Sequence, residues 1–234
     1  MNTSRKKFHL WDQVEENGRG GGGGGESRDG GSNDQNNGIL QSFSEPPAQP
    51  EPLQTSLFDR QLVEKAGAVS IGKSNAQVTI VKFLDLTCGM CQYAYQNVIP
   101  QIKQAYADSG KVRLVFRNFP LGGMNTKAAY FAQAAECAAK QGKYQEFVSY
   151  FYEHKKELTK ENVAEQTKTL MNDSEKFQSC LANGETAGIV QKDIEDGQKL
   201  GIEGTPFFYV NGNLIRGAQP FETFKEAIEK ELKK

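Results

Sequence analysis

The sequence predicts an α/β domain that carries a large inserted block of helices. Three observations support this class. A β-rich run, a helical pattern and a second β-rich run follow one another between residues 76 and 119. The next stretch, about 122–201, is helical in character throughout. Strand patterns return at 206–217, and an amphipathic helix closes the chain.

The first part of the chain differs in composition from this domain. Residues 17–56 combine a glycine run with the Pro-rich stretch "SEPPAQPEP". Such a segment cannot bury enough apolar surface to offset the entropy lost on ordering. We therefore expect residues 1–65 to be a disordered tail or tether, and residues 66–234 to form the domain.

Charge and hydropathy exclude several function classes. The 28 basic and 29 acidic residues nearly cancel, so the chain has no net field that would gather nucleic acid. The glycine run at 20–25 lacks the Lys-Ser/Thr of a phosphate-binding loop. No stretch of about 18 apolar residues predicts a membrane span. The start, "MNTSRKKFHLWDQVEENGRG", is basic but has no apolar signal-peptide region behind it.

The domain begins with a strand–helix–strand pattern. The run "AQVTIVKFLDL" (76–86) is typical of a central strand, and "KVRLVFRNF" (111–119) predicts a second one. Residues 90–108 between them predict a helix, which Pro100 should kink. A strand, a helix and a strand over such a length predict two parallel strands joined by a right-handed crossover.

The helical block shows start and stop signals of its own. The expected N-caps are Asn125 or Thr126, Thr159 and Asp173, and the expected stops are Gly142 and Gly184. The aromatic cluster at 144–151 predicts a core and not a peptide groove. After the block, "PFFYV" (206–210) and "NLIRG" (213–217) predict strands joined by an Asn211-Gly212 hairpin turn. A helix at 221–232 completes the domain.

Two cysteines, in Cys88-Gly89-Met90-Cys91, lie where the first strand ends and the helix begins. A thiolate at a helix N-terminus meets unpaired N–H groups and the positive end of the helix dipole, which lowers its pKa. Cys88 is therefore the expected nucleophile. Cys91, almost one turn later on the same face, can resolve a mixed disulfide.

Four stretches together resemble the DsbA-like branch of the thioredoxin superfamily, over about residues 66–234. They are "VTIVKFLDLTCGMC", the helix kinked at Pro100, "VRLVFRNFPL" and "GIEGTPFFYVNG". A helical block between the second strand and the hairpin, here at about 122–201, marks that branch. The resemblance implies a thioredoxin fold with an inserted helical subdomain. It also implies a thiol–disulfide oxidoreductase that needs no cofactor.

The resemblance implies roles for further residues. The family's cis-proline corresponds to Pro206, which should lie against the Cys88–Cys91 pair, with the Thr205 backbone free to pair with an extended substrate. Proline is tolerated as the first residue of a strand, and an X-Pro bond can be cis. Asp85 is either a proton carrier for Cys91 or a strand-end carboxylate with local hydrogen bonds.

Two departures from the family pattern qualify the resemblance. The dipeptide Gly89-Met90 supplies no histidine between the cysteines, so one source of thiolate stabilisation is missing and a less oxidising potential is expected. Lys82 stands where many relatives carry an acid, six positions before Cys88.

The other two cysteines, Cys137 and Cys180, lie on predicted helices of the block. They are either buried thiols or partners in a disulfide, and the disulfide is favoured because some DsbA-like proteins staple this block. A zinc site normally needs two close pairs of ligands. Cys137 and Cys180 are isolated, and His9 and His154 have no ligand spacing, so no metal is expected.

The expected activity is disulfide exchange with cysteine-containing substrate proteins, recycled by a separate redox partner. The alternatives are a reductase or isomerase, and a non-catalytic binding module of the same fold. A disulfide in the block would persist only where thiols are oxidised. This favours a location outside the cytoplasm, with membrane attachment only through a tether. Read literally, the N-terminus without a signal region would leave the protein in the cytoplasm.

Overall fold

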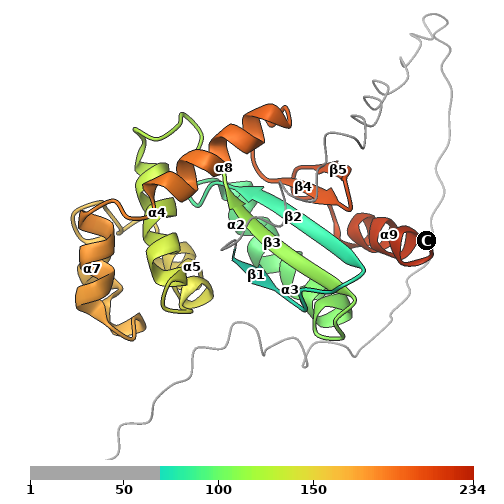
Figure 1. Cartoon of the computed structure of the whole chain (residues 1–234), viewed down its shortest axis with the longest axis horizontal. Coiled ribbons are helices and arrows are strands. Elements are labelled where there is room, and N and C mark those ends of the chain that lie inside the picture. The colour runs from blue at the N-terminus through green and yellow to red at the C-terminus, as the bar shows by residue number, and fades with distance from the viewer. Residues whose placement is uncertain (1–68) are drawn as a thin grey trace, which may run out of the picture. The chain divides into compact units, whose positions relative to one another are not determined.

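The structure is a computed structural model that describes residues 69–234. The tail predicted for residues 1–65 lies outside the described residues. Within residues 69–234, five strands form one sheet in the order β1-β3-β2-β4-β5 (Figure 1). The strands are β1 (Ser70–Ile71), β2 (Val78–Leu84), β3 (Val112–Asn118), β4 (Phe207–Val210) and β5 (Asn213–Arg216).

The centre of the sheet is the predicted parallel pair. β2 and β3 run parallel from Val78↔Val112 to Leu84↔Asn118. β4 pairs with β2, and β5 with β4, both antiparallel. A strand that is covered on both faces is apolar at nearly every position, because no side chain points into water. This explains the nearly continuous apolar run of β2. The antiparallel strand β1 was not predicted, because two residues are too short to show a period.

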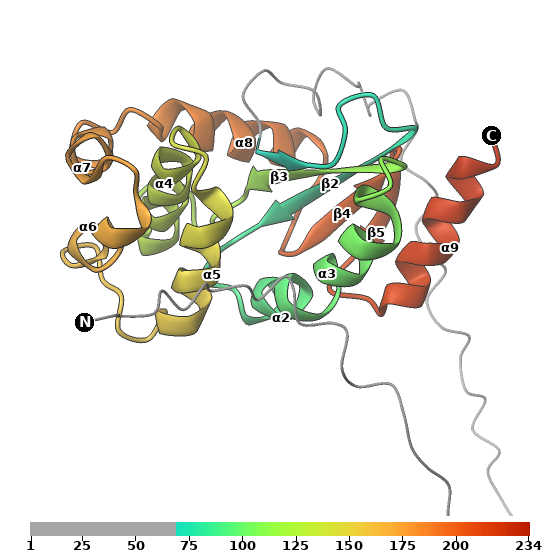
Figure 2. The same cartoon turned by 90° about the horizontal axis from the view of Figure 1, so that it is seen from below.

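The helices α2 (Gly89–Asn97) and α3 (Ile99–Ile102) follow β2 on one face of the sheet (Figure 2). Pro100 lies in the first turn of α3, where a missing N–H leaves no hydrogen bond unmade. The predicted kink is therefore a break between two helices, followed by a π-helical turn, Lys103–Ala107. α9 (Phe221–Leu232) also lies on this face, with the Phe224 ring 4.7 Å from that of Phe208.

The opposite face of the sheet is covered by α8 (Ala187–Lys199) (Figures 1 and 2). Gly197 on this helix allows a close approach to the chain after β3. A Cβ at Gly197 would lie 2.5 Å from Cδ2 of Phe119. The side chains of Val81 and Phe83, Leu200 and Ile202 complete an apolar core on this side.

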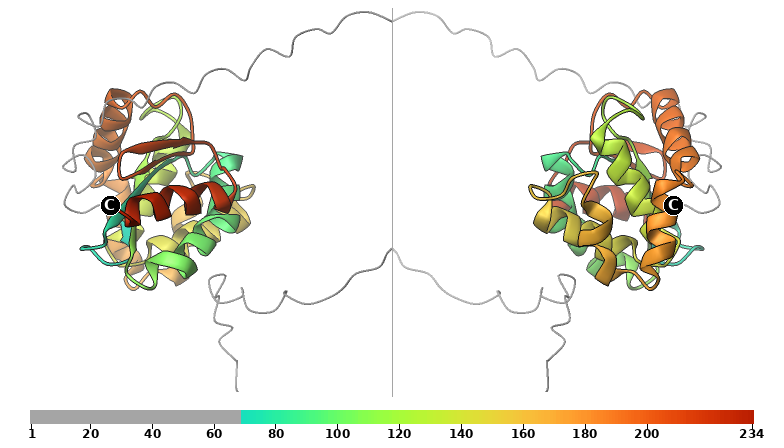
Figure 3. Two further views of the ribbon diagram at one scale, coloured as in Figure 1. Left: turned by 90° about the vertical axis from the view of Figure 1, so that its right-hand side faces the viewer. Right: turned by 90° about the vertical axis from the view of Figure 1, so that its left-hand side faces the viewer.

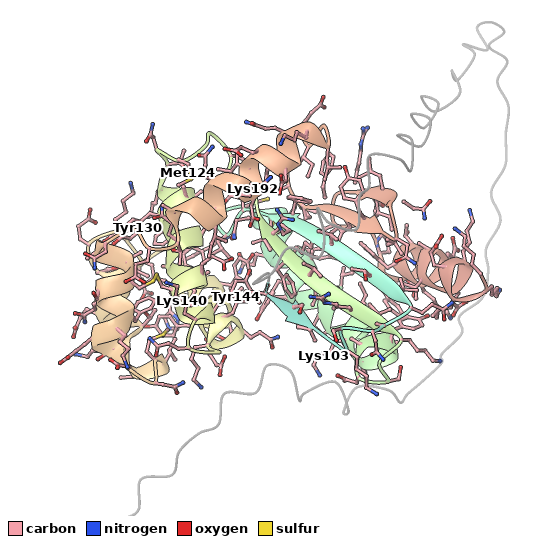
Figure 4. The ribbon with its side chains drawn as sticks, in the orientation of Figure 1. Lys103, Met124, Tyr130, Lys140, Tyr144 and Lys192 are labelled. Carbon is pink, nitrogen blue, oxygen red and sulfur yellow. A yellow bond between two sulfur atoms is a disulfide. The ribbon has the colours of Figure 1, made fainter. Side chains whose placement is uncertain are left out.

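The inserted block, apart from α8, lies at one end of the sheet (Figures 1 and 2), and the right-hand view of Figure 3 looks onto that end. Its elements are α4 (Lys127–Ala139), α5 (Tyr144–His154), α6 (Val163–Gln166), a 3₁₀ turn (Lys168–Leu170), α7 (Ser174–Ala182) and α8. The aromatic cluster is core as predicted, since Phe147 and Phe151 are fully buried. Cys137 and Cys180 form a disulfide that joins α4 to α7, with their Cα atoms 5.9 Å apart (Figure 4).

Most of the predicted helix signals are used. The Thr126 hydroxyl accepts from Ala129 N at 3.1 Å and caps α4, and Asp173 caps α7. Thr159 is wrong as an N-cap, because Asn162 holds that position before α6. The Thr159 hydroxyl accepts instead from N–H groups in the preceding turn, at Glu161 and Asn162.

A buried ionic network ties the block to the end of β3. The Arg117 side chain donates to Asp193 Oδ1 at 2.5 Å and to Asp196 Oδ2 at 2.7 Å, both on α8. The neighbouring Asn118 Nδ2 donates to Glu136 Oε1 on α4 at 2.7 Å. All five residues are buried. These contacts fix the two helices against the strand that precedes the block.

Glu136 should make stability depend on pH. Burial, opposed by the Asn118 hydrogen bond, raises its pKa from 4.5 to about 7. The folded state then holds this proton more tightly than the unfolded state. Its contribution is full below pH 4.5 and is lost as pH rises through 7, by ~3 kcal/mol at about 1.4 kcal/mol per pKa unit.

We therefore expect Glu136→Gln to remove this loss and to be more stable than the parent above pH 7. The glutamine oxygen can still accept from Asn118. Urea unfolding between pH 4.5 and 8 measures the effect. Glu185→Gln, at an exposed ion pair with Lys140, is the control that should leave the slope unchanged. Equal pH slopes in the parent and Glu136→Gln would contradict the assignment.

Candidate active site

The two active-site candidates Cys88 and Cys91 lie at the start of α2. Cys88 is the N-cap residue, with extended backbone angles, and its N–H donates to the Asp85 carbonyl at 3.1 Å. Its side chain is partly exposed, whereas Cys91 in the first turn is completely buried. Both are thiols in this structure. An attacking or leaving sulfur at Cys88 is therefore accessible to another protein, and one at Cys91 is not.

The surroundings of Cys88 favour its thiolate and lower its pKa from 9.0 to about 5. The largest cause is a hydrogen bond from the Cys91 thiol, which burial partly opposes. Further hydrogen bonds come from Thr205 and from the N–H groups of Cys91 and Met90. The N–H groups are those that a helix start leaves without internal partners.

Cys91 responds in the opposite direction. Burial is the largest cause that raises its pKa, and the hydrogen bond it gives to Cys88 adds to this. The positive charge of Lys82 and the Asp85 backbone act against the rise. The pair is thus asymmetric: Cys88 carries the charge and Cys91 holds the proton.

The Thr205–Pro206 peptide bond is cis in the structure, and Pro206 is buried directly before β4. The pairing of β4 with β2 brings this segment beside the start of α2. The Cys88 thiol lies 3.3 Å from the Thr205 carbonyl oxygen. Among the described residues, the buried Thr205 hydroxyl has no conventional N/O hydrogen-bond partner, so it is free to turn toward the Cys88 sulfur.

Asp85 is buried in the loop between β2 and α2. Its carboxylate accepts from the N–H and the hydroxyl of Thr87, both at 2.7 Å, and from Leu121 N at 2.9 Å. This matches the local hydrogen-bonding role of the two expected for Asp85. The backbone of Asp85, and not its carboxylate, is what favours the Cys91 thiolate. Its role as a proton carrier stays a prediction.

Lys82 is the residue that sequence reasoning did not place in the site. It was noted only because it stands where relatives have an acid. In the structure its side chain is buried under α2, and Nζ donates to the Cys91 carbonyl at 3.3 Å. The alternation of β2 could have predicted this face, because Lys82 shares it with the apolar Ile80 and Leu84.

Apolar side chains are exposed on the segments that carry the site. Met90, between the cysteines, is 51% exposed, and Tyr93 on α2 is 49% exposed. Leu121 is 44% exposed, and its N–H is bound to the Asp85 carboxylate. Three exposed apolar side chains thus lie on segments that adjoin the cysteine pair in the chain or are bound to its loop.

The described residues hold neither a metal site nor a membrane span. Within residues 69–234, no three or more histidine, cysteine or acidic side chains are grouped to bind a metal ion. No helix in that range combines the length and hydropathy needed to cross a bilayer. The Cys137–Cys180 disulfide leaves those two sulfurs unavailable as thiolate ligands.

Known proteins resemble this chain over the whole described domain. The thioredoxin family model matches residues 64–230. A probable disulfide bond formation protein D of Bacillus anthracis is 37% identical over 70% of this chain and 78% of its own length. The oxidised BdbD structure from Bacillus subtilis superposes with a TM-score of 0.64 at 28% identity, over 72% of this chain and 94% of that one.

A thioredoxin-like oxidoreductase from Silicibacter pomeroyi also superposes on this chain. Its TM-score is 0.62 at 26% identity, over 75% of this chain and 99% of that one. The family match covers well over half of the residues, and the predicted helical insertion is present between β3 and β4. The chain belongs to the thioredoxin family, as a DsbA-like thiol–disulfide oxidoreductase.

Proposed function

We propose that this protein forms disulfide bonds in exported proteins through the Cys88–Cys91 pair. The observation that carries the direction is the lowered pKa of Cys88, about 5. A sulfur of low pKa is a good leaving group, and a stabilised thiolate favours the reduced state of the pair. Both effects make the disulfide form of the pair an oxidant.

The reaction begins with the pair oxidised. A substrate thiolate attacks the accessible Cys88 sulfur, the Cys88–Cys91 bond breaks, and Cys91 leaves as a thiolate that takes up a proton. A second substrate thiolate then attacks the substrate sulfur of the mixed disulfide and expels the Cys88 thiolate. The substrate gains a disulfide, and its two electrons remain on the reduced pair.

Thr205 and Pro206 are the proposed substrate-positioning residues. The Thr205 carbonyl lies beside Cys88, so an extended substrate backbone could pair with the Thr205 peptide while its cysteine reaches the sulfur. The exposed side chains of Met90, Tyr93 and Leu121 supply an apolar surface suited to unfolded segments.

The reduced pair must pass its electrons to a redox partner before another cycle. The proposed compartment is outside the cytoplasm, where such a partner and substrate thiols meet under oxidising conditions. The Cys137–Cys180 disulfide supports this location, since such bonds are rare in reducing compartments. Residues 1–65 are the proposed tether, and residues 66–234 the working domain.

Mixing the oxidised full chain with a reduced, unfolded protein of known cysteine content tests the direction. We expect substrate disulfides to form in proportion to the oxidised protein added, and the Cys88–Cys91 potential to be more oxidising than that of the glutathione couple. A potential well below that of glutathione would favour the reductase alternative. No exchange in either direction would favour the binding module.

A further inference from the structure

Lys82 is a buried cation in the middle of the sheet, beneath the cysteine pair. Its side chain is 1% exposed and lies on the face of β2 that α2 covers. Nζ donates to the Cys91 carbonyl at 3.3 Å and lies 5.8 Å from the centre of the Phe208 ring. An ammonium group can donate three hydrogen bonds, so this environment leaves it poorly satisfied.

Among the residues that the structure describes, no carboxylate compensates the charge of Lys82. Within residues 69–234 it forms no ion pair, and the nearby Asp85 carboxylate is occupied by Thr87 and Leu121. Desolvation is accordingly the largest cause that lowers its pKa, to about 8, while Cys91 and then Cys88 oppose the shift. Near neutral pH, Lys82 can therefore both hold and release a proton.

The neighbouring elements place two kinds of group around Lys82. The strands contribute aromatic rings, and the start of α2 contributes the two sulfurs that interact with its charge. β3 and β4 place Phe116 and Phe208 beside it in register. α2 contributes Cys88 and Cys91.

Beyond α2, two phenols of α5, Tyr144 and Tyr152, interact with the Cys91 charge. Burial raises their pKa far above the ordinary value, so they remain neutral. The Tyr152 hydroxyl is buried without a hydrogen-bond partner among the described residues. A buried surrounding of neutral groups strengthens the interaction between Lys82 and the sulfurs.

We propose that Lys82 carries the proton of Cys91 during disulfide exchange, in a role that rests on the proposed redox function of the pair. When Cys91 resolves a mixed disulfide at Cys88, the neutral amine of Lys82 takes the Cys91 proton. The Cys91 thiolate forms the bond to Cys88, and the other sulfur of the mixed disulfide leaves as a thiolate. In the opposite direction the Lys82 ammonium returns the proton to the departing Cys91.

Reach and charge both support this assignment. Nζ donates to the carbonyl of Cys91, and the Cys91 sulfur is near enough for its charge to act on Lys82. Proton transfer leaves an ammonium beside a new thiolate, and their attraction lowers the barrier to forming that thiolate. The same positive charge stabilises the reduced pair and makes its disulfide more oxidising.

Resolution of a mixed disulfide measured against pH tests the proposal. The reduced full chain is mixed with excess oxidised glutathione, and samples are quenched in acid at intervals and alkylated. Mass spectrometry then gives the fraction of the protein present as the glutathione adduct. In the parent, the rate of loss of the Cys88–glutathione adduct should rise through a limb near pH 8, set by the Lys82 pKa. Lys82→Met should lack this limb and resolve at least ~10-fold more slowly at pH 7.

Two further variants separate proton transfer from packing and from charge. Lys82→Arg keeps the charge but cannot release a proton, so it should also lack the limb while retaining a more oxidising potential than Lys82→Met. It also carries the test if Lys82→Met does not fold. Lys103→Met removes a partly exposed lysine of the π-helical turn (Figure 4) and should behave as the parent.

The outcomes separate this inference from the proposed function. A parent that forms no adduct at Cys88 would contradict the proposed function itself. The Lys82 role alone would be overturned if the parent exchanges normally and both Lys82→Met and Lys82→Arg resolve the adduct at the parent's rate and with the parent's pH limb. Near-ultraviolet circular dichroism confirms that each variant compared is folded.

Discussion

Cys88→Ser should abolish disulfide exchange, whereas Cys91→Ser should still attack disulfides and remain trapped as a mixed disulfide. A serine hydroxyl does not ionise near neutral pH, so the first variant has no nucleophile at the exposed position. The second variant keeps the Cys88 thiol but has no sulfur to resolve the adduct. Mass spectrometry of each variant after reaction with a disulfide-containing protein distinguishes the two outcomes.

The pH dependence of alkylation checks the same assignment. In the reduced parent, the alkylation rate of Cys88 should be half-maximal near pH 5, and not near 9.0. In Cys91→Ala the midpoint should move upward, because this variant removes the hydrogen bond that is the largest cause of the lowered pKa of Cys88. A fast-reacting thiol that persists in Cys88→Ser and disappears in Cys91→Ser would reverse the roles of the two cysteines.

The lowered pKa of Cys88 also links its charge to stability. The reduced folded state releases this proton more readily than the unfolded state does. The stabilisation is therefore present above the ordinary pKa of 9.0 and is lost as pH falls through about 5. The oxidised protein has no such thiolate, so the difference in stability between reduced and oxidised forms should shrink as the solution is acidified toward pH 5.

Replacing Cys137 and Cys180 together by alanine should lower the free energy of unfolding by about 4 kcal/mol. The disulfide joins residues 43 apart in the sequence, and the chain-entropy model gives this magnitude for such a loop. Without it, α7 is held by its packing against α4, α6 and the 3₁₀ turn. Urea unfolding of the oxidised parent and the double variant measures the difference.

The double variant should retain the fast Cys88 thiol under conditions where it is folded. The disulfide joins α4 to α7, whereas the site is built from α2 and the segment before β4. Reduction of the parent should reproduce the stability loss, after correction for the effect of the Cys88 thiolate. A loss under 1 kcal/mol would mean that the linkage contributes little to the folded state.

The sequence alone was sufficient where local pattern decides the outcome. The apolar runs of β2 and β3, the cysteines at the start of α2 and the Asn211-Gly212 turn all depend on neighbours along the chain. Asn211 and Gly212 both take positive φ, at 44° and 91°, as the predicted hairpin turn requires. The helical character of residues 122–201 also followed from local patterns, and the family resemblance added the expected place of Thr205-Pro206 beside the cysteine pair.

What the tertiary structure decided depends on contacts between residues distant in sequence. Strand β1 is defined by its partner β3 and not by its own two residues. Asp85 is held by Thr87 and by Leu121, which follows the second strand, so its hydrogen bonds could not be assigned from spacing. Thr159 has the chemistry of an N-cap, but the chain turns once more before α6 begins.

Lys82 shows most clearly what could not be predicted from the sequence alone. A lysine in a strand is ordinarily interpreted as solvent-facing, and its alternation places it on one face of β2 without saying what covers that face. The helix α2 that covers this face begins at the cysteines. Strand β4, more than a hundred residues later in the chain, pairs with β2 and places Phe208 beside Lys82. The sequence by itself placed the cysteine pair at a helix start and predicted Cys88 as the nucleophile. Only the packed sheet decided that a buried amine would lie beneath the second sulfur, because desolvation and charge coupling exist only once distant segments exclude water.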